Sequence, residues 1–198
     1  MNFIGAALKA TPADIDRIAA DLKVEAAAFR AVIEVEAAGF GFDKAGRPKA
    51  LFERHHFYRN LKALPEQQAA AVAAGLAYPK WGEKPYPKGS DAVYAEITRA
   101  CAINEDAALL STSWGLGQIM GFNYRMVGRP SVQAMVKEAA DAEAGQLRQM
   151  AAFIRASGLQ GALATKDWAK FARGYNGPSY AKNAYDAKLA KAYVKFQG

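Results

Sequence analysis

Apolar residues recur at helical spacing along most of this chain. Thr11 and Pro12 can begin a helix, because threonine caps a helix N-terminus and proline fits its first position. An apolar stripe at spacings of three and four residues follows from Ile15 to Leu22. A second helix is predicted from about residue 25 to residue 38, with Gly39 placed to end it.

Two regions interrupt this helical pattern. Residues 40–55 contain several turn residues and a segment, 49–53, that fits a short strand, so we predict a hairpin there. Residues 78–89 are too rich in proline and glycine for a helix. Further helices are predicted at about 65–77, 91–102, 131–140, 141–156, 166–173 and 179–196, with Ser90, Asn104 and Thr165 as caps. The fold class predicted is a mainly α-helical globule with one small β-hairpin insertion near residues 40–55.

Composition places this pattern in a globular protein. The chain has 198 residues, of which 52% are hydrophobic and 23% charged, so we expect residues 1–198 to form a single domain. No uncharged apolar run is long enough to span a membrane. The single cysteine, Cys101, excludes an internal disulfide and is expected in the core. The segment 1–9 is too short and too weakly apolar for a standard signal peptide.

Positive charge is concentrated toward the C-terminus. The net charge is +7, and residues 160–198 hold seven basic against two acidic residues. Such a surface favours a polyanion: nucleic acid, an anionic membrane or an acidic wall polymer. The last predicted helix carries an apolar stripe from Tyr185 to Phe196 flanked by lysines, without the clustered arginine and amide side chains of a DNA-reading helix. We therefore expect no nucleic-acid partner, and a possible contact of this helix with an anionic outer membrane.

Glu36 has the position of a candidate general acid. It follows Phe29 by seven residues, Val32 by four and Ile33 by three, and these offsets place all four on one helix face. Burial and the negative end of the helix both disfavour an ionised carboxylate, so its pKa should be raised. A glutamic acid that keeps its proton near neutral pH can act as a general acid. The alternative is a boundary residue in an ion pair.

Two later segments, 111–121 and 173–178, suit recognition of a sugar. They combine glycines, which let a ligand approach the backbone, with the amide side chains of Gln118 and Asn176. Trp114 and Tyr175 add flat apolar faces. Taken singly, each segment is also typical of a tight helix crossing or a helix cap.

Other chemistries have little support. His55 and His56 are adjacent and cannot both face one ion, and no cysteine or histidine cluster accompanies them, so we expect no metal. Neither a phosphate-binding glycine loop nor a Gly-x-Ser-x-Gly elbow is present. No cofactor is expected.

In their order, these segments resemble the lysozyme-like superfamily, which includes goose-type lysozymes and soluble lytic transglycosylases. Over about residues 11–193 the chain is most similar to the phage-type N-acetylmuramidase, or endolysin, family. The segments that carry this resemblance are 31–36, 51–55, 113–124 and 175–178. Two departures are Ala37, where the transglycosylase pattern has serine, and Gly117, which replaces a bulkier residue.

The resemblance implies cleavage of peptidoglycan between N-acetylmuramic acid and N-acetylglucosamine. Glu36 would protonate the leaving oxygen, with Glu53 or Asp43 as a second carboxylate. Strand alternation puts Glu53 on the face of Leu51, so we prefer Glu53, although an ion pair with a nearby arginine is an even alternative. The residues expected to bind substrate are Ser113, Gln118, Tyr124, Tyr175 and Asn176, with the Tyr175 hydroxyl also holding Glu36.

The same resemblance implies a place of action. We expect a monomeric enzyme, made in the host cytoplasm without a signal peptide, that reaches the wall in the periplasm after the membrane is permeabilised. We expect no separate wall-binding module. The alternatives are a lytic transglycosylase that uses the same glutamate, and a non-catalytic basic domain that binds wall or nucleic acid.

Overall fold

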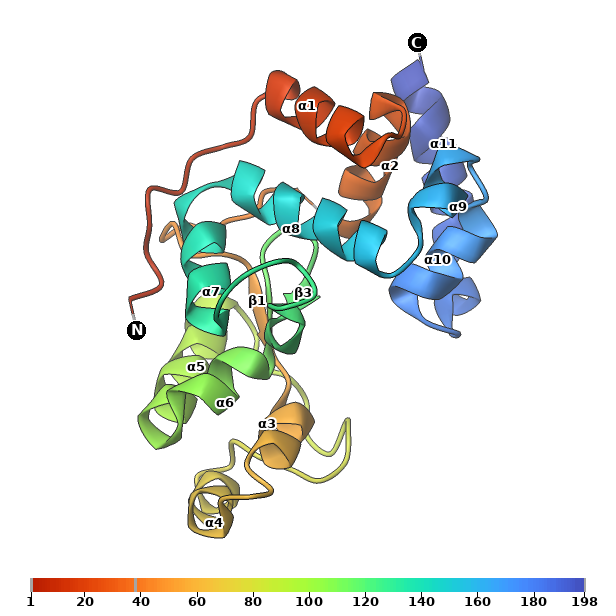
Figure 1. Ribbon diagram of the computed structural model, residues 1–198. Helices are drawn as coiled ribbons and strands as arrows, with labels where there is room; N and C mark the ends of the chain where they lie inside the picture. The colour runs from red at the N-terminus through yellow and green to blue at the C-terminus, as the bar shows by residue number, and fades with distance from the viewer. Residues whose placement is uncertain (1, 38, 198) are drawn as a thin grey trace.

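The computed structural model describes residues 2–37 and 39–197 and consists mainly of helices (Figure 1). The α-helices are α1 (Pro12–Leu22), α2 (Ala26–Ala37), α3 (Arg54–Asn60), α4 (Pro65–Ala73), α5 (Ser90–Ile103), α6 (Glu105–Leu110), α7 (Val132–Asp141), α8 (Glu143–Ala156), α9 (Gln160–Ala164), α10 (Trp168–Asn176) and α11 (Tyr185–Gln197). Two 3-10 helices are η1 (Gly121–Asn123) and η2 (Tyr180–Asn183), and the strands are β1 (Ala50–Phe52), β2 (Thr112–Trp114) and β3 (Ile119–Met120). The predicted mainly α-helical class is confirmed. No helix in the described part of the chain is long and apolar enough to cross a membrane.

Local capping signals explain several helix ends. Thr11 caps α1 as predicted, because its Oγ1 accepts from the backbone N–H of Asp14. The Asp14 carboxylate in turn accepts from the backbone N–H of Thr11, which completes a capping box. The helix predicted over 25–38 is α2; its predicted last residue, Ala38, lies outside the described residues. The caps predicted at Ser90 and Thr165 are wrong. Gly89 precedes α5 and Asp167 caps α10.

The small sheet is antiparallel, with strand order β1–β2–β3. Leu51 of β1 lies opposite Ser113 of β2, which lies opposite Met120 of β3. The hairpin predicted near residues 40–55 is present in reduced form, as an antiparallel bridge between Phe42 and Pro48 with backbone hydrogen bonds from Asp43 to Arg47 and from Lys49 to Gly41. The predicted strand at 49–53 forms β1, but its partner is β2 and not the local turn. Periodicity along one segment cannot identify a partner strand that lies far away in sequence.

Two hydrophobic clusters form the interior. The first joins α1, α2 and α8 to α9–α11 around Phe29 and Phe171; the second joins α3–α7 and the sheet around Phe57 and Trp114. The partly buried ring of Tyr175 packs against both. In Figure 1, α8 extends from the region of α7 toward α9 and α10 and so connects the two parts.

The two ends of the chain are both tied to the body. Phe3 is buried with its ring 5.7 Å from that of Trp114, and Leu8 forms a parallel bridge with Ala142. At the other end, α11 packs on α2 and α10 and buries Leu189 and Tyr193. This is the apolar stripe predicted for the last helix.

Candidate active site

A cleft with a volume of about 480 Å³ lies where the two hydrophobic clusters meet. Four parts of the chain line it: the end of α2, the segment from residue 43 through β1, the start of α5 and the turn between β2 and β3. Its lining residues are Glu36, Asp43, Lys49, Ala50, Leu51, Gly89, Ser90, Val93, Gly115, Leu116 and Gln118. The cleft therefore combines the candidate acid Glu36 with the glycine-rich turn identified in the sequence.

Glu36 lies at the edge of the core. Phe29 and Val32, on the same helix face, are fully buried, whereas the Glu36 side chain is half-buried and lines the cleft. Nδ2 of Asn176 donates a hydrogen bond of 2.9 Å to its Oε1. Burial raises the pKa of Glu36, and the Asn176 hydrogen bond opposes that rise without cancelling it. The direction of this pKa shift agrees with the sequence prediction.

Asn176 and Tyr175 end helix α10, and the contact predicted for the Tyr175 hydroxyl differs from the one that the structure shows. The Tyr175 hydroxyl donates to the carbonyl oxygen of Gly117 at 3.2 Å, so it steadies the turn between β2 and β3. The hydrogen bond to Glu36 comes from Asn176 instead. The expectation that the Tyr175 hydroxyl holds Glu36 is therefore wrong. Oδ1 of Asn176 is buried and has no hydrogen-bond partner among the described residues.

Polar side chains of the turn between β2 and β3 form hydrogen bonds within the turn and stabilise it. Ser113 is buried and donates from Oγ to Oε1 of Gln118 at 2.9 Å. Gln118 donates from Nε2 to the carbonyl oxygen of Gly115 at 2.9 Å, and its backbone adopts a left-handed φ of 47°. Gln118 remains exposed in the cleft, while Ser113 lies behind it. Tyr124 packs on the second cluster and is not among the lining residues.

Asp43 lines the cleft, but its carboxylate is committed to holding a turn. Oδ1 accepts the backbone N–H groups of Ala45 and Arg47, and Oδ2 accepts from Arg47 Nε at 2.7 Å and from Ser90 Oγ at 2.6 Å. Burial acts to raise the pKa of Asp43, but the hydrogen bonds from Ser90 and Arg47 outweigh it and lower that pKa. The contact with Asp43 also explains why Ser90 does not cap α5.

Glu53 lies just beyond the cleft lining, at the end of β1. Leu51 lines the cleft, Phe52 is buried on the opposite face, and the extended backbone of Glu53 returns its side chain to the side of Leu51. Its Oε2 accepts a hydrogen bond of 2.6 Å from the Tyr86 hydroxyl and lies 3.2 Å from Nδ1 of His55. The ion pair expected as its alternative does not form, because Arg54 pairs with Glu96 and Arg47 with Asp43.

Two side chains of α8 brace the walls of the cleft, and sequence reasoning missed both. Gln146 accepts from the Leu116 backbone N–H at 2.8 Å and donates to the Ala139 carbonyl oxygen at 2.8 Å. Glu143 accepts from the backbone N–H groups of Gly41 at 2.8 Å and of Ala10 at 3.0 Å. Both side chains are buried. The sequence did contain a signal for them, because both are polar residues on the apolar face of a predicted helix. A polar side chain in such a position requires a specific hydrogen-bond partner.

Close packing around Gln146 explains two glycines. A Cβ on Gly41 would lie 2.2 Å from Oε1 of Gln146, and a Cβ on Gly115 would lie 2.7 Å from its Cγ. Any larger residue at either position would displace the amide that holds Leu116. Within residues 2–37 and 39–197, no group of three histidine, cysteine, aspartate or glutamate side chains is placed to hold a metal ion.

Comparison with known proteins finds a matching family model and matching solved structures. Residues 25–197 match the model of the family described as N-acetylmuramidase. The fold is similar to the crystal structure of a Burkholderia AP3 phage endolysin, with a TM-score of 0.87 and 43% sequence identity, covering 96% of this chain and 72% of that one. A comparison with curated proteins found no match.

Proposed function

Since the chain belongs to the N-acetylmuramidase family, we propose that Glu36 is the general acid that cleaves the bond between N-acetylmuramic acid and N-acetylglucosamine. The chain is a glycoside hydrolase, a muramidase that degrades peptidoglycan. The observation that carries the proposal is Glu36 itself, a half-buried carboxyl group in the cleft with a raised pKa.

The hydrogen bond from Asn176 gives the two oxygens of Glu36 different tasks. Asn176 Nδ2 occupies Oε1, and no described residue donates to Oε2. A proton on Oε2 can then point toward the glycosidic oxygen while Oε1 stays anchored. Because the raised pKa keeps Glu36 protonated at higher pH than an exposed glutamate, the acid is ready before the substrate binds.

Glu53 is the better candidate for the second carboxylate. Every hydrogen bond of the Asp43 carboxylate serves the turn at residues 43–47 or Ser90, so Asp43 acts as a structural anchor. On Glu53, Tyr86 and His55 contact only Oε2 among the described residues. Its Oε1 can therefore stabilise a positively charged transition state or hold the attacking water.

The remaining proposals concern substrate contact. Gln118 lines the cleft and exposes its amide, which suits sugar hydroxyl or N-acetyl groups. The unpartnered Oδ1 of Asn176 is an acceptor beside the acid. We assign Ser113 and Tyr175 to support of the turn that carries Gln118, and Tyr124 to its flank.

The test is a digest of purified peptidoglycan analysed by mass spectrometry. The proposal requires products with N-acetylmuramic acid at a reducing end, and no such products from Glu36→Gln. Products that end in an anhydro sugar would remove the need for a second carboxylate and contradict the role of Glu53. An active Glu36→Gln variant would contradict the role of Glu36.

A further inference from the structure

Three aromatic rings follow one another beside Glu53: those of His55, His56 and Phe122, here called the aromatic row. The ring centroids of His55 and His56 are 4.2 Å apart, and those of His56 and Phe122 are 5.2 Å apart. None of the three lines the cleft. The row is therefore a separate feature from the site described above.

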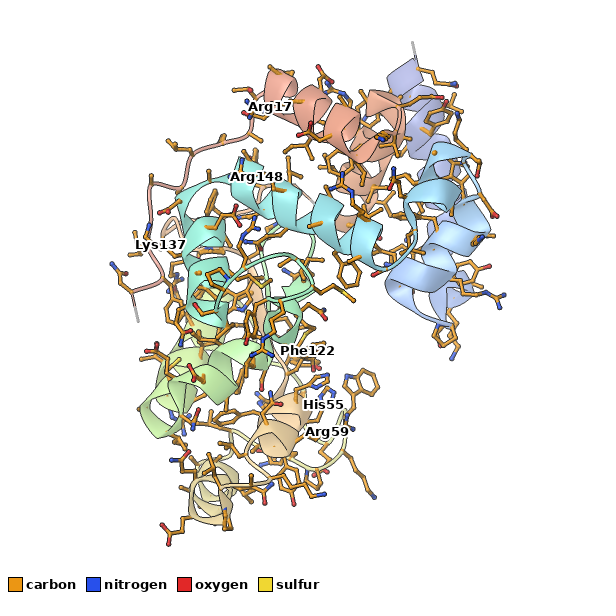
Figure 2. The ribbon with its side chains drawn as sticks, in the orientation of Figure 1. Arg17, His55, Arg59, Phe122, Lys137 and Arg148 are labelled. Carbon is orange, nitrogen blue, oxygen red and sulfur yellow. The ribbon has the colours of Figure 1, made fainter. Side chains whose placement is uncertain are left out.

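The row is accessible at its far end. Phe122, in η1, exposes 45% of its surface although it is a large apolar residue. On α3, His56 is half-buried, whereas the side chain of His55 is only 12% exposed and forms the inner end of the row. Figure 2 shows Phe122, His55 and Arg59 close together on one side of the molecule. The three rings are tilted to one another, by 43° between His55 and His56 and by 50° between His56 and Phe122, so they form a stepped aromatic surface whose exposed end is Phe122.

The aromatic row begins where the cleft ends. Leu51 lines the cleft, and Glu53, two residues later on the same side, contacts His55 through Oε2. The same oxygen accepts from Tyr86, which belongs to the loop that ends at the cleft residues Gly89 and Ser90. Leu51, Glu53 and the row thus form one continuous path from the cleft to Phe122.

We propose that the aromatic row binds sugar rings of the glycan strand where the strand leaves the cleft toward η1. The inference rests on the proposed function, since it assigns a surface to the polymer that is cleaved. A strand is longer than a cleft of about 480 Å³ can enclose, so part of it must lie on the neighbouring surface. We assign the strand to the aromatic row because this row continues directly from the cleft through Leu51 and Glu53.

The chemistry of the row suits a sugar. One face of a pyranose ring presents C–H groups, which pack on aromatic rings, while its hydroxyl groups point outward to polar partners. Burial lowers the pKa of both His55 and His56, so both imidazoles are neutral at neutral pH and present aromatic faces without charge. The positive charge of Arg59 acts on both histidines and suits the carboxylates carried by muramic acid side chains.

The experiment measures binding of two glycan fragments to chains that carry Glu36→Gln, so that nothing is cleaved. The fragments are a tetrasaccharide and an octasaccharide, which is twice as long and extends further along the surface beyond the cleft. In that background we compare Phe122→Ala, His56→Gln and the conservative Phe122→Tyr, which keeps an aromatic face. Leu64→Ala is the matched control, because Leu64 has a similar exposure of 42% and lies outside the cleft lining.

Phe122→Ala and His56→Gln should each weaken octasaccharide binding about two- to tenfold and leave tetrasaccharide binding unchanged, as expected for the loss of one stacking contact. Phe122→Tyr and Leu64→Ala should bind both fragments as the parent does. Equal octasaccharide binding by the parent and both row variants would overturn the inference. So would a parent that binds a single-stranded oligonucleotide more tightly than the octasaccharide through Phe122.

This outcome is separate from that of the proposed function. If the chain with Glu36 intact cleaved neither fragment, the catalytic proposal would fail, while the binding comparison would still decide the role of the row. If cleavage occurred at Glu36 and binding were insensitive to Phe122 and His56, only the row would be rejected. Thermal unfolding of each variant identifies any loss of fold.

Discussion

Asn176 donates a hydrogen bond of 2.9 Å to the carboxylate of Glu36, a residue 140 positions earlier in the chain. The bond joins the end of α10 to the end of α2 and opposes the rise that burial causes in the pKa of Glu36. Asn176 therefore fixes the position of the Glu36 carboxyl group and also limits the rise of its pKa.

Replacing Glu36 with glutamine should abolish cleavage. The glutamine keeps an oxygen for Asn176 but has no proton to donate, and the loss of a general acid costs about 10²–10⁴ in rate. The measurement is kcat/KM on purified walls. Retention of half the parental rate by a folded variant would exclude Glu36 as the acid.

The same variant gives a check that does not depend on activity. Because the pKa of Glu36 is raised in the fold, its contribution to stability is present below the pKa of the unfolded chain and is lost as pH rises through the folded value. Glu36→Gln cannot ionise and should therefore unfold at a higher temperature than the parent at neutral pH. The difference should shrink in acid.

Removing the amide of Asn176 should shift the pH profile. Without its hydrogen bond, the pKa of Glu36 should rise further, so the alkaline limb of kcat/KM against pH should move to higher pH in Asn176→Ala while the maximum falls. Asn183→Ala, an exposed asparagine in η2, is the control. A lower maximum with an unmoved alkaline limb would mean that Asn176 acts on the substrate and not on the acid.

Substitution of Glu53 should reduce activity, whereas substitution of Asp43 should reduce stability. Glu53→Gln should lose most activity at nearly parental stability, whereas Asp43→Asn should lower the free energy of unfolding by about 1–3 kcal/mol, because it weakens buried hydrogen bonds to Arg47 and Ser90. Thermal unfolding and wall cleavage are measured together. An active Glu53→Gln beside an inactive but stable Asp43→Asn would transfer the role to Asp43.

Gln146 should affect substrate binding through the turn it supports. Gln146→Leu leaves the Leu116 N–H and the Ala139 carbonyl without partners, which costs about 1–3 kcal/mol each, and should raise KM more than it lowers kcat. Gln149→Leu is a matched control, because Gln149 is equally buried on α8 but bonds to Met135 and Glu138, away from the cleft. A similar rise of KM in both variants would show a general effect of instability.

The lysines of η2 and α11 should attract anionic surfaces. Lys195 forms an ion pair with Glu34 at 2.6 Å, so the test replaces Lys182, Lys188 and Lys191 with glutamine. Binding to whole walls and to outer-membrane vesicles should fall, as it should for the parent when salt rises, because exposed charges are screened over about 8 Å at physiological ionic strength. Cleavage of a short soluble glycan should not change. Unchanged wall binding at low salt would leave α11 with a structural role alone.

Sequence reasoning succeeded where neighbouring residues determine the structure. The cap at Thr11, the apolar stripe of α11 and the face of α2 that carries Glu36 all depend on residues within about two helical turns. It failed where the partner is distant. The pairing of β1 with β2, the contact of Ser90 with Asp43 and the bond from Asn176 to Glu36 depend on tertiary contacts that no local pattern contains.

The same distinction between local and distant contacts applies to the candidate site. The residue types and the order of the segments predicted Glu36, Gln118 and Asn176 as site residues, and the structure places the first two in the cleft and Asn176 on Glu36. The hydrogen bonds of their polar atoms could be found only from the geometry. Ser113 was expected to bind substrate on the basis of the family resemblance, but its side chain is buried and donates a hydrogen bond to Gln118.

The carboxylate of Glu143 has a consequence for the order in which the enzyme assembles. It binds backbone groups of Gly41 and Ala10, residues 102 and 133 positions earlier. Contacts of such sequence separation require closure of long loops and tend to form late in folding. During synthesis, Ala10 and Gly41 therefore cannot bind Glu143 before α8 has emerged from the ribosome, so this wall of the cleft cannot form earlier. Until then Glu36 has no finished cleft around it, so we expect this cleft to be among the last parts of the structure to form.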